Sequence, residues 1–361
     1  INDGFFVFAS KTDEEDDHLL SGESIFRSPG DLRPLTLKNA DNKMTAGITN
    51  WIIKPVVEQS ASISQRGFVG DRQMGQNSVN LDHHSRLDAL KFTPFMENAS
   101  LRYLSEMSIS MMDLLHSMPL LLLFDFAAAF PSVAHAWIFY VLFHINMPDG
   151  LYDLISALYK CNLAYMSTPE GIKFLFIILS GVLQGCPLSG SLFVIAIDPL
   201  LHMFRIKLED SALGTVCACA DDIGIALKIA GVLPWLYQTF ESFRLVSGLT
   251  LKPSKSCIVL TVCQCSDNNK AVFKHYLSLI CPAWVDMNLV DSAKYLGIFL
   301  GPKAGSFQWT KAMRKFEDRV SHINNMQLPT QLARGQFITR ALPVLGFIAQ
   351  FVQPPKGITR S

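Results

Sequence analysis

Residues 217–227 read CACADDIGIAL, so two adjacent aspartates, Asp221 and Asp222, stand between apolar runs. The small residues before this pair and the alternating isoleucines after it predict two short strands joined by a tight acidic turn. Neighbouring carboxylates repel each other, and burial disfavours both ionised forms. A divalent cation removes this conflict, and Mg²⁺ prefers carboxylates combined with substrate phosphate oxygens. Taken alone, however, a solvated turn in an ordinary hairpin explains the pair better.

A third carboxylate closes another apolar run. Residues 119–130 read PLLLLFDFAAAF, which places Asp125 at the end of a strand-like segment. One acid at a strand end and two at a hairpin turn can form a two-metal site, which supports in-line phosphoryl transfer. By itself, Asp125 is equally consistent with a strand end or a helix N-cap.

The segment between the two acidic stretches is rich in glycine. Residues 180–190 read SGVLQGCPLSG, and the apolar run SLFVIAI follows at residues 191–197. Glycines allow the backbone to approach a partner closely, and the hydroxyl and amide side chains can reach a phosphate or a base. The apolar run predicts a buried helix.

With these segments in this order, the chain resembles the reverse transcriptase domain of non-LTR (LINE-type) retrotransposons. Each matching stretch is weak alone, but seven occur in the family's order between about residue 31 and residue 302. They are residues 33–37 (RPLTL) with Lys43, 65–72 (QRGFVGDR), 125–130 (DFAAAF), 181–189 (GVLQGCPLS), 220–222 (ADD), 248–256 (GLTLKPSKS) and 295–301 (YLGIFLG).

The resemblance implies an α+β fold of the right-hand polymerase type, with fingers, a ferredoxin-like antiparallel palm and part of a helical thumb. Residues 1–30 are expected to form a polar, poorly ordered leader. The fingers are expected at 31–118 and 135–175, the palm with the catalytic aspartates at 119–134 and 176–300, and the start of the thumb at 301–361. The pattern predicts helices over residues 48–60, 87–115, 136–143, 150–159, 235–246 and 309–325.

The implied activity is that of an RNA-directed DNA polymerase, a nucleotidyltransferase that extends a primer 3′-hydroxyl by a two-metal mechanism. The expected cofactor is a pair of Mg²⁺ ions, with Mn²⁺ as a substitute. The expected partners are an RNA template, a DNA primer and deoxynucleoside triphosphates, without a membrane, within a longer polyprotein that carries an endonuclease.

The resemblance also assigns roles to individual residues. Asp125, Asp221 and Asp222 are the expected metal ligands and catalytic acids, and Lys255 is expected near the leaving pyrophosphate. The expected substrate contacts are Phe130 against the sugar, Gln184 and Gly185 near the nucleotide, and Lys43 and Arg72 on the triphosphate. Alternative interpretations stay open: Phe130 as a core aromatic, Gln184 as a loop-capping amide, and the three basic residues as solvated surface charges.

Three positions depart from the family's pattern. Cys219 stands where an aromatic residue is usual, Ala128 replaces a common lysine, and Gly190 replaces the usual proline. None of them removes an expected metal ligand. A degenerate, catalytically weak or inactive relative that binds nucleic acid is therefore the alternative function.

Composition sets broader limits. The chain has 361 residues, of which 49% are hydrophobic, and its 31 basic residues balance its 31 acidic ones. The hydrophobic content excludes disorder as the main state, whereas nucleic-acid binders usually carry a basic excess. A membrane or scaffold protein is the third alternative. Polar residues, however, interrupt both of the longest apolar runs, residues 119–143 and 174–183. No signal peptide is visible, which favours an intracellular location, nuclear at the site of action, over secretion.

Overall fold

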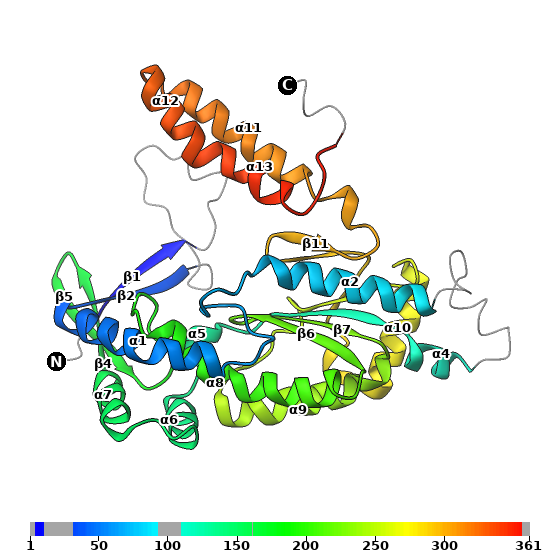
Figure 1. Ribbon diagram of the computed structural model, residues 1–361, viewed down its shortest axis with the longest axis horizontal. Coiled ribbons are helices and arrows are strands. Elements are labelled where there is room, and N and C mark those ends of the chain that lie inside the picture. The colour runs from blue at the N-terminus through cyan, green and yellow to red at the C-terminus, as the bar shows by residue number, and fades with distance from the viewer. Residues whose placement is uncertain (1–3, 11–31, 93–109, 161, 356–361) are drawn as a thin grey trace.

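The computed structural model describes residues 4–10, 32–92, 110–160 and 162–355 (Figure 1). The strands are β1 (Gly4–Ser10), β2 (Leu32–Lys38), β3 (Leu120–Phe124), β4 (Asn162–Thr168), β5 (Gly171–Ile178), β6 (Gly214–Cys219), β7 (Asp222–Leu227), β8 (Cys257–Leu260), β9 (Asn288–Val290), β10 (Ala293–Tyr295) and β11 (Ile298–Leu300). The helices are α1 (Ala40–Ser60), α2 (Gly75–Phe92), α4 (Met111–Ser117), α5 (Ala129–Ser132), α6 (His135–His144), α7 (Asp149–Tyr159), α8 (Ser189–Phe204), α9 (Leu233–Ser247), α10 (Asp267–Ile280), α11 (Thr310–Asn325), α12 (Thr330–Gln336) and α13 (Leu342–Ala349).

The central sheet has five strands in the order β6-β7-β3-β8-β9. β3 lies in the middle and pairs antiparallel with both β7 and β8, while β9 joins β8 in parallel. All five residues of β3 are buried, as expected for a central strand covered on both faces. The predicted α+β fold with a mainly antiparallel sheet is confirmed.

Alternate residues of β3 enter two different cores. Leu120, Leu122 and Phe124 belong to a large core that also contains residues of α8, α9 and α10. Leu121 and Leu123 belong to a second core with Leu81 of α2 and residues of β10, β11, α11 and α13. Because side chains alternate between the faces of a strand, one face of the sheet carries α8 to α10, and the other carries α2 and the C-terminal elements (Figure 1).

A second sheet has the strand order β2-β1-β4-β5. Here β1 pairs antiparallel with β2 and parallel with β4, so the start of the chain joins residues 162–178. The prediction that residues 1–30 form only a polar leader is therefore wrong for Gly4–Ser10, because backbone pairing with β2 and β4 orders this stretch; residues 11–31 lie outside the described residues. The β4–β5 hairpin was not predicted, because its apolar run lacks a clear strand alternation.

Several predicted helices are confirmed. Helices α6, α7, α9 and α11 match the predicted segments with small changes at their ends, and α8 contains the predicted run at residues 191–197. Helix α1 contains the predicted segment 48–60 but begins at Ala40, well before the predicted start. The prediction of one continuous helix over residues 87–115 is wrong, because Ser110 is the non-helical N-cap of α4; α2 covers the predicted segment up to Phe92, and residues 93–109 lie outside the described part.

The C-terminal segment forms the helical arm of α11, α12 and α13, which stands above the face of the sheet that carries α2 (Figure 1). Within the described ranges, we find no helix with the length and apolar character needed to span a bilayer.

Candidate active site

The two adjacent aspartates lie at the turn of the β6–β7 hairpin, as predicted. Cys219 pairs with Asp222, so Ala220 and Asp221 form a two-residue turn. Ala220 has a φ of 56°, in the left-handed region that favours glycine at such turn positions. Ile223 and Ile225 are fully buried after the turn, which fixes the hairpin to the body of the protein.

Asp125 follows the last residue of β3 and lies beside this hairpin. The β3–β7 register pairs Phe124 with Ile223, and its continuation by one residue places Asp125 opposite Asp222. Residues opposite each other in an antiparallel pair point to the same face. Strand alternation assigns both aspartates to the face of Leu123 and Ala226, which is also the face that carries α2 and the C-terminal arm.

Asp221 and Asp125 both contribute to the electrostatic surroundings of Asp222. The pKa of Asp222 is raised to about 6, first because surrounding protein partly removes the carboxyl from water and then because Asp221 and Asp125 add negative charge nearby. The side chain of Asp222 still keeps contact with solvent. However, among the described residues no group of three or more His, Cys, Asp or Glu side chains is placed to bind one metal ion together. The structure therefore brings the expected ligands together at one end of the central strands, without a ready-made ligand group.

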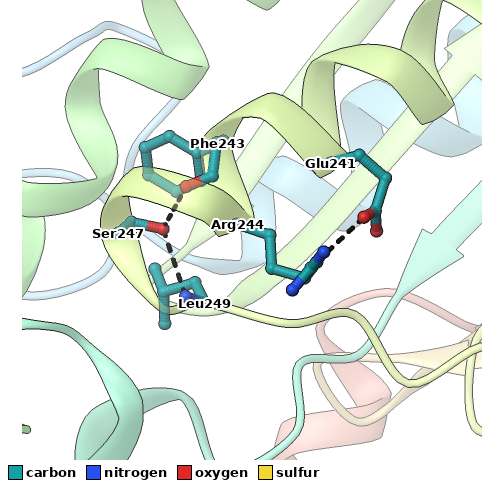
Figure 2. Close-up of polar contacts among 5 residues, drawn as sticks. All are labelled: Glu241, Phe243, Arg244, Ser247 and Leu249. Carbon is teal, nitrogen blue, oxygen red and sulfur yellow. Dashed lines mark hydrogen bonds and ion pairs between the residues drawn. The ribbon is translucent and has the colours of Figure 1, made fainter.

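The end of α9 directs the chain back to Asp125. Ser247 accepts a hydrogen bond from the backbone N–H of Leu249 at 3.1 Å and donates one to the carbonyl of Phe243 at 2.7 Å, while Arg244 pairs with Glu241 (Figure 2). Gly248, with a φ of 78°, ends the helix in the left-handed conformation common at helix C-termini.

The segment after this cap then runs beside Asp125. The N–H of Lys252 donates to the carbonyl of Asp125 at 2.8 Å, and the N–H of Asp125 donates to the hydroxyl of Ser256 at 3.1 Å. Lys255 lies between these two contacts along the chain, and its side chain is exposed. The structure thus places Lys255 at the same end of the sheet as the aspartates.

The glycine-rich loop before α8 packs against the segment that follows Asp125. Gly181 donates a backbone hydrogen bond to Val133 at 2.7 Å, and a Cβ at this position would lie 2.5 Å from the carbonyl oxygen of Pro131. Farther along, Gln184 is half-buried and Gly185 is exposed with a φ of 100°. Both residues therefore lie on the loop that contacts the Asp125 segment.

Phe130 has aromatic partners on two sides. Its ring stacks on Phe193 of α8 with centroids 4.4 Å apart, and Phe68 meets it edge-on at 5.7 Å. Phe68 is 55% exposed, and a Cβ on Gly190 would lie 2.7 Å from its ring. Phe130 is thus a half-buried ring that packs on the core through Phe193. Phe68, which the sequence reasoning missed, is the more exposed ring of this aromatic cluster.

The two basic residues expected on the triphosphate differ in their surroundings. Lys43 lies on α1 with an exposed side chain. Arg72 donates to the backbone carbonyls of Glu58, Ala61, Ser62 and Gln65 at 2.6–3.1 Å. These contacts cap the C-terminal end of α1, a site that favours a cation. Arg72 therefore has an architectural role in this structure, and its contact with a triphosphate stays a prediction.

Comparison with known proteins agrees with this arrangement. The profile of the family "Reverse transcriptase (RNA-dependent DNA polymerase)" matches residues 20–300, which is most of the chain. The chain belongs to the reverse transcriptase family. It is 27% identical over 225 residues to the "Retrovirus-related Pol polyprotein from type-1 retrotransposable element R2" of Bradysia coprophila. This match covers 58% of the chain but only 26% of that protein, so the chain spans about a quarter of its relative.

Solved structures show the same fold. Telomerase from Candida tropicalis, in complex with a fragment of telomeric RNA, superposes with a TM-score of 0.55 at 10% identity over 98% of this chain and 53% of that chain. The corresponding telomerase complex from Candida albicans gives a TM-score of 0.53 at 9% identity over 96% of this chain and 54% of that chain. The predicted right-hand polymerase fold and the relationship to non-LTR retrotransposons are thereby confirmed.

Proposed function

We propose that this reverse transcriptase domain is an active polymerase that extends the 3′-hydroxyl of a DNA primer with deoxynucleotides on an RNA template. The observation that carries the proposal is the strand register that sets Asp125 opposite Asp222, with Asp221 beside them at the hairpin turn. Family membership and the similarity to an R2 polyprotein support the same reaction.

The donor chemistry of the three aspartates fits a divalent cation. Carboxylate oxygens are the ligands that Mg²⁺ prefers in sites that also bind substrate phosphates. The raised pKa of Asp222 reflects burial first and repulsion from Asp221 and Asp125 second, and a bound cation would stabilise the ionised carboxylate against both. In the proposal, Asp125, Asp221 and Asp222 would hold two Mg²⁺ ions, with Mn²⁺ as a substitute. Such a pair would supply electrostatic stabilisation of the attacking and leaving oxygens.

The remaining predicted residues act on the substrate in this proposal. Phe130 lies against the sugar of the incoming nucleotide, and Gln184 and Gly185 contact the nucleotide from the neighbouring loop. Lys255 lies near the leaving pyrophosphate as an electrostatic or acid partner, and Lys43 neutralises the triphosphate. The role of Lys255 is supported by its location at the same end of the sheet as the aspartates.

We further propose the division of the chain that the sequence suggested. Residues 31–118 and 135–175 act as fingers, 119–134 and 176–300 as palm, and 301–361 as the start of a thumb. The helical arm of α11, α12 and α13 above the aspartate face supports this division (Figure 1). The domain works inside the cell, in the nucleus, as part of a longer polyprotein with an endonuclease.

A primer-extension assay with Mg²⁺ or Mn²⁺ tests the proposed function. Asp125→Asn and Asp221→Asn are expected to reduce extension at least about a thousandfold, or about 4 kcal/mol of transition-state stabilisation, while primer–template binding is kept. Asp286→Asn, which changes an exposed loop carboxylate, is the matched control and is expected to extend normally. Near-normal rates in either catalytic variant would contradict the assignment.

The alternative is a catalytically weak or inactive relative that still binds nucleic acid. Cys219 favours it, because a half-buried thiol replaces the usual aromatic residue directly beside the aspartate turn. Primer–template binding by the wild-type chain, without extension in either metal, would support this alternative over the polymerase.

A further inference from the structure

The backbone of the β6–β7 hairpin is held by side chains from three distant parts of the chain. We call Gln65, Asn77 and Tyr295 the hairpin clamp. Gln65 precedes α2, Asn77 lies on α2, and Tyr295 ends β10. Gln65 and Asn77 are completely buried and Tyr295 is 4% exposed, so their polar atoms contact protein rather than water.

Gln65 binds both polar groups of the turn residue Ala220. Its side-chain oxygen accepts hydrogen bonds at 2.8 Å from the N–H groups of Ala220 and Gly67, and its side-chain nitrogen donates to the carbonyl of Ala220 at 3.3 Å. Ala220 is the residue in the left-handed conformation, which costs an alanine about 1–2 kcal/mol. One buried amide therefore holds the backbone of the residue that directly precedes Asp221 and Asp222.

Tyr295 contacts both strands of the hairpin through its side-chain hydroxyl. Its hydroxyl lies 3.1 Å from the carbonyl of Asp222 and 3.3 Å from the carbonyl of Cys217, so its single hydrogen is shared between these two acceptors. Burial is the largest cause that raises the pKa of Tyr295 well above its usual value, so the phenol stays protonated and remains a donor at neutral pH.

Asn77 connects the hydroxyl of Tyr295 to the backbone of strand β6. Its side-chain nitrogen donates to the carbonyl of Ala218 at 2.9 Å and to the hydroxyl of Tyr295 at 3.5 Å, and its oxygen accepts from Arg66. Buried polar networks with satisfied members fix a structure strongly, because each unpaired group would lose its hydrogen bond without gaining water. The clamp therefore fixes both the turn and the spacing of the strands that bear the aspartates.

We propose that Gln65 and Tyr295 are positioning residues of the polymerase reaction, which set the geometry of the aspartate hairpin through its backbone. This inference rests on the proposed function. Tyr295 also begins the β10–β11 turn, the segment whose sequence resembles the hairpin that grips the primer. The hydroxyl of Tyr295 therefore connects the β10–β11 hairpin to the backbone carbonyl of Asp222, the residue whose carboxylate faces Asp125.

Tyr295→Phe is the sharpest variant, because it removes only the hydroxyl and leaves the buried ring. Tyr276→Phe is the matched control: Tyr276 is 1% exposed on α10, and its hydroxyl makes no hydrogen bond among the described residues. Gln65→Met is the second variant, since it keeps the side-chain length and removes both hydrogen-bonding functions. If Gln65→Met does not fold, Tyr295→Phe alone carries the test.

The first measurement is hydrogen–deuterium exchange of the peptide that covers residues 214–227, which needs no enzymatic activity. We expect at least about tenfold faster exchange of this peptide in Tyr295→Phe and Gln65→Met, with wild-type exchange in Tyr276→Phe. Unchanged exchange in Tyr295→Phe overturns the inference, whether or not the chain is a polymerase.

The second measurement is primer extension with separate determination of kcat, KM and primer–template affinity. We expect kcat to fall at least about tenfold and the Mg²⁺ concentration for half-maximal rate to rise, while primer–template affinity changes less than about twofold. A loss confined to primer affinity, or a kcat equal to that of Tyr276→Phe, overturns the positioning role. A wild-type chain that does not extend primers overturns the proposed function instead, and exchange of the 214–227 peptide then decides the inference alone.

Discussion

Replacing Gly67 by alanine is expected to disturb the aspartate hairpin from outside it. Gly67 does not lie in the left-handed region, so its backbone conformation alone permits alanine. A Cβ at this position, however, would lie 2.3 Å from the backbone nitrogen of Ala220 and 2.8 Å from the carbonyl carbon of Cys219. Both contacts are with backbone atoms, so no side-chain rotation can relieve them, and either the 61–72 segment or the hairpin must move.

The free-energy cost follows from two opposing effects. Overpacking of a tight site costs about 1–3 kcal/mol, whereas glycine-to-alanine replacement recovers about 0.4–1 kcal/mol by restricting the unfolded chain. We therefore expect Gly67→Ala to lower the free energy of unfolding by about 1–2 kcal/mol. Gly47→Ala is the control of opposite sign: Gly47 lies within α1, a Cβ there has no neighbour within 4 Å, and alanine is expected to stabilise by about 0.5–1 kcal/mol.

Urea unfolding of both variants measures these changes, and primer extension measures their effect on the site. Because the clash falls on the residue before Asp221, we expect kcat of Gly67→Ala to fall at least about tenfold, while Gly47→Ala extends at the wild-type rate. A Gly67→Ala protein that is stabilised like Gly47→Ala, with unchanged kcat, would show that the 61–72 segment does not press on the hairpin.

Three further changes test other parts of the site. Phe130→Val is expected to raise ribonucleotide incorporation relative to deoxynucleotide incorporation by at least about tenfold in kcat/KM, since a smaller side chain leaves room for a 2′-hydroxyl; equal loss on both substrates would indicate a purely structural ring. Asp222→Asn without metal is expected to stabilise the fold at pH 8 by about 1 kcal/mol, after allowance for solvent screening, and by about a third of that at pH 4.5. The sign of this effect follows from the pKa of Asp222, which is raised to about 6 in the folded state. The folded state binds the proton more tightly than the unfolded state, so the wild-type free energy of unfolding falls as pH rises from about 4 to 6. Urea unfolding of both proteins at pH 4.5 and pH 8 measures the difference. Cys219→Tyr is expected to increase extension at unchanged metal dependence, because the ring restores contact area beside the turn; lower activity in the same assay would mean that the pocket has repacked around cysteine.

The sequence was sufficient for the elements that carry strong local patterns. The run of leucines before Asp125 predicted a buried strand, and β3 forms there with all of its residues buried. The two aspartates between apolar runs likewise predicted the β6–β7 hairpin and its turn. By contrast, the pairing of Gly4–Ser10 with residues from β2 and β4 depends on contacts between distant segments, which local periodicity does not encode.

The candidate site divides in the same way. Motif order identified Asp125, Asp221 and Asp222, but their relation depends on the β3–β7 register, which only the folded sheet supplies. Arg72 shows the limit of residue type as evidence, because a guanidinium suits a phosphate and a cluster of backbone carbonyls at and after a helix end equally well. Gln65 and Tyr295 act on backbone groups, so nothing about their side-chain chemistry indicates the partner in advance.

Backbone anchoring also explains how the hairpin can tolerate an unusual residue at Cys219. A slip of β7 by one residue against β3 would move Asp222 to the opposite face of the sheet, away from Asp125. The clamp opposes that slip through the carbonyls of Cys217, Ala218 and Asp222 and through both polar groups of Ala220. These contacts are independent of the side chain at Cys219. The loss of an aromatic residue there therefore removes packing beside the turn but leaves intact the contacts that fix the register, so the two opposing aspartates keep their shared face.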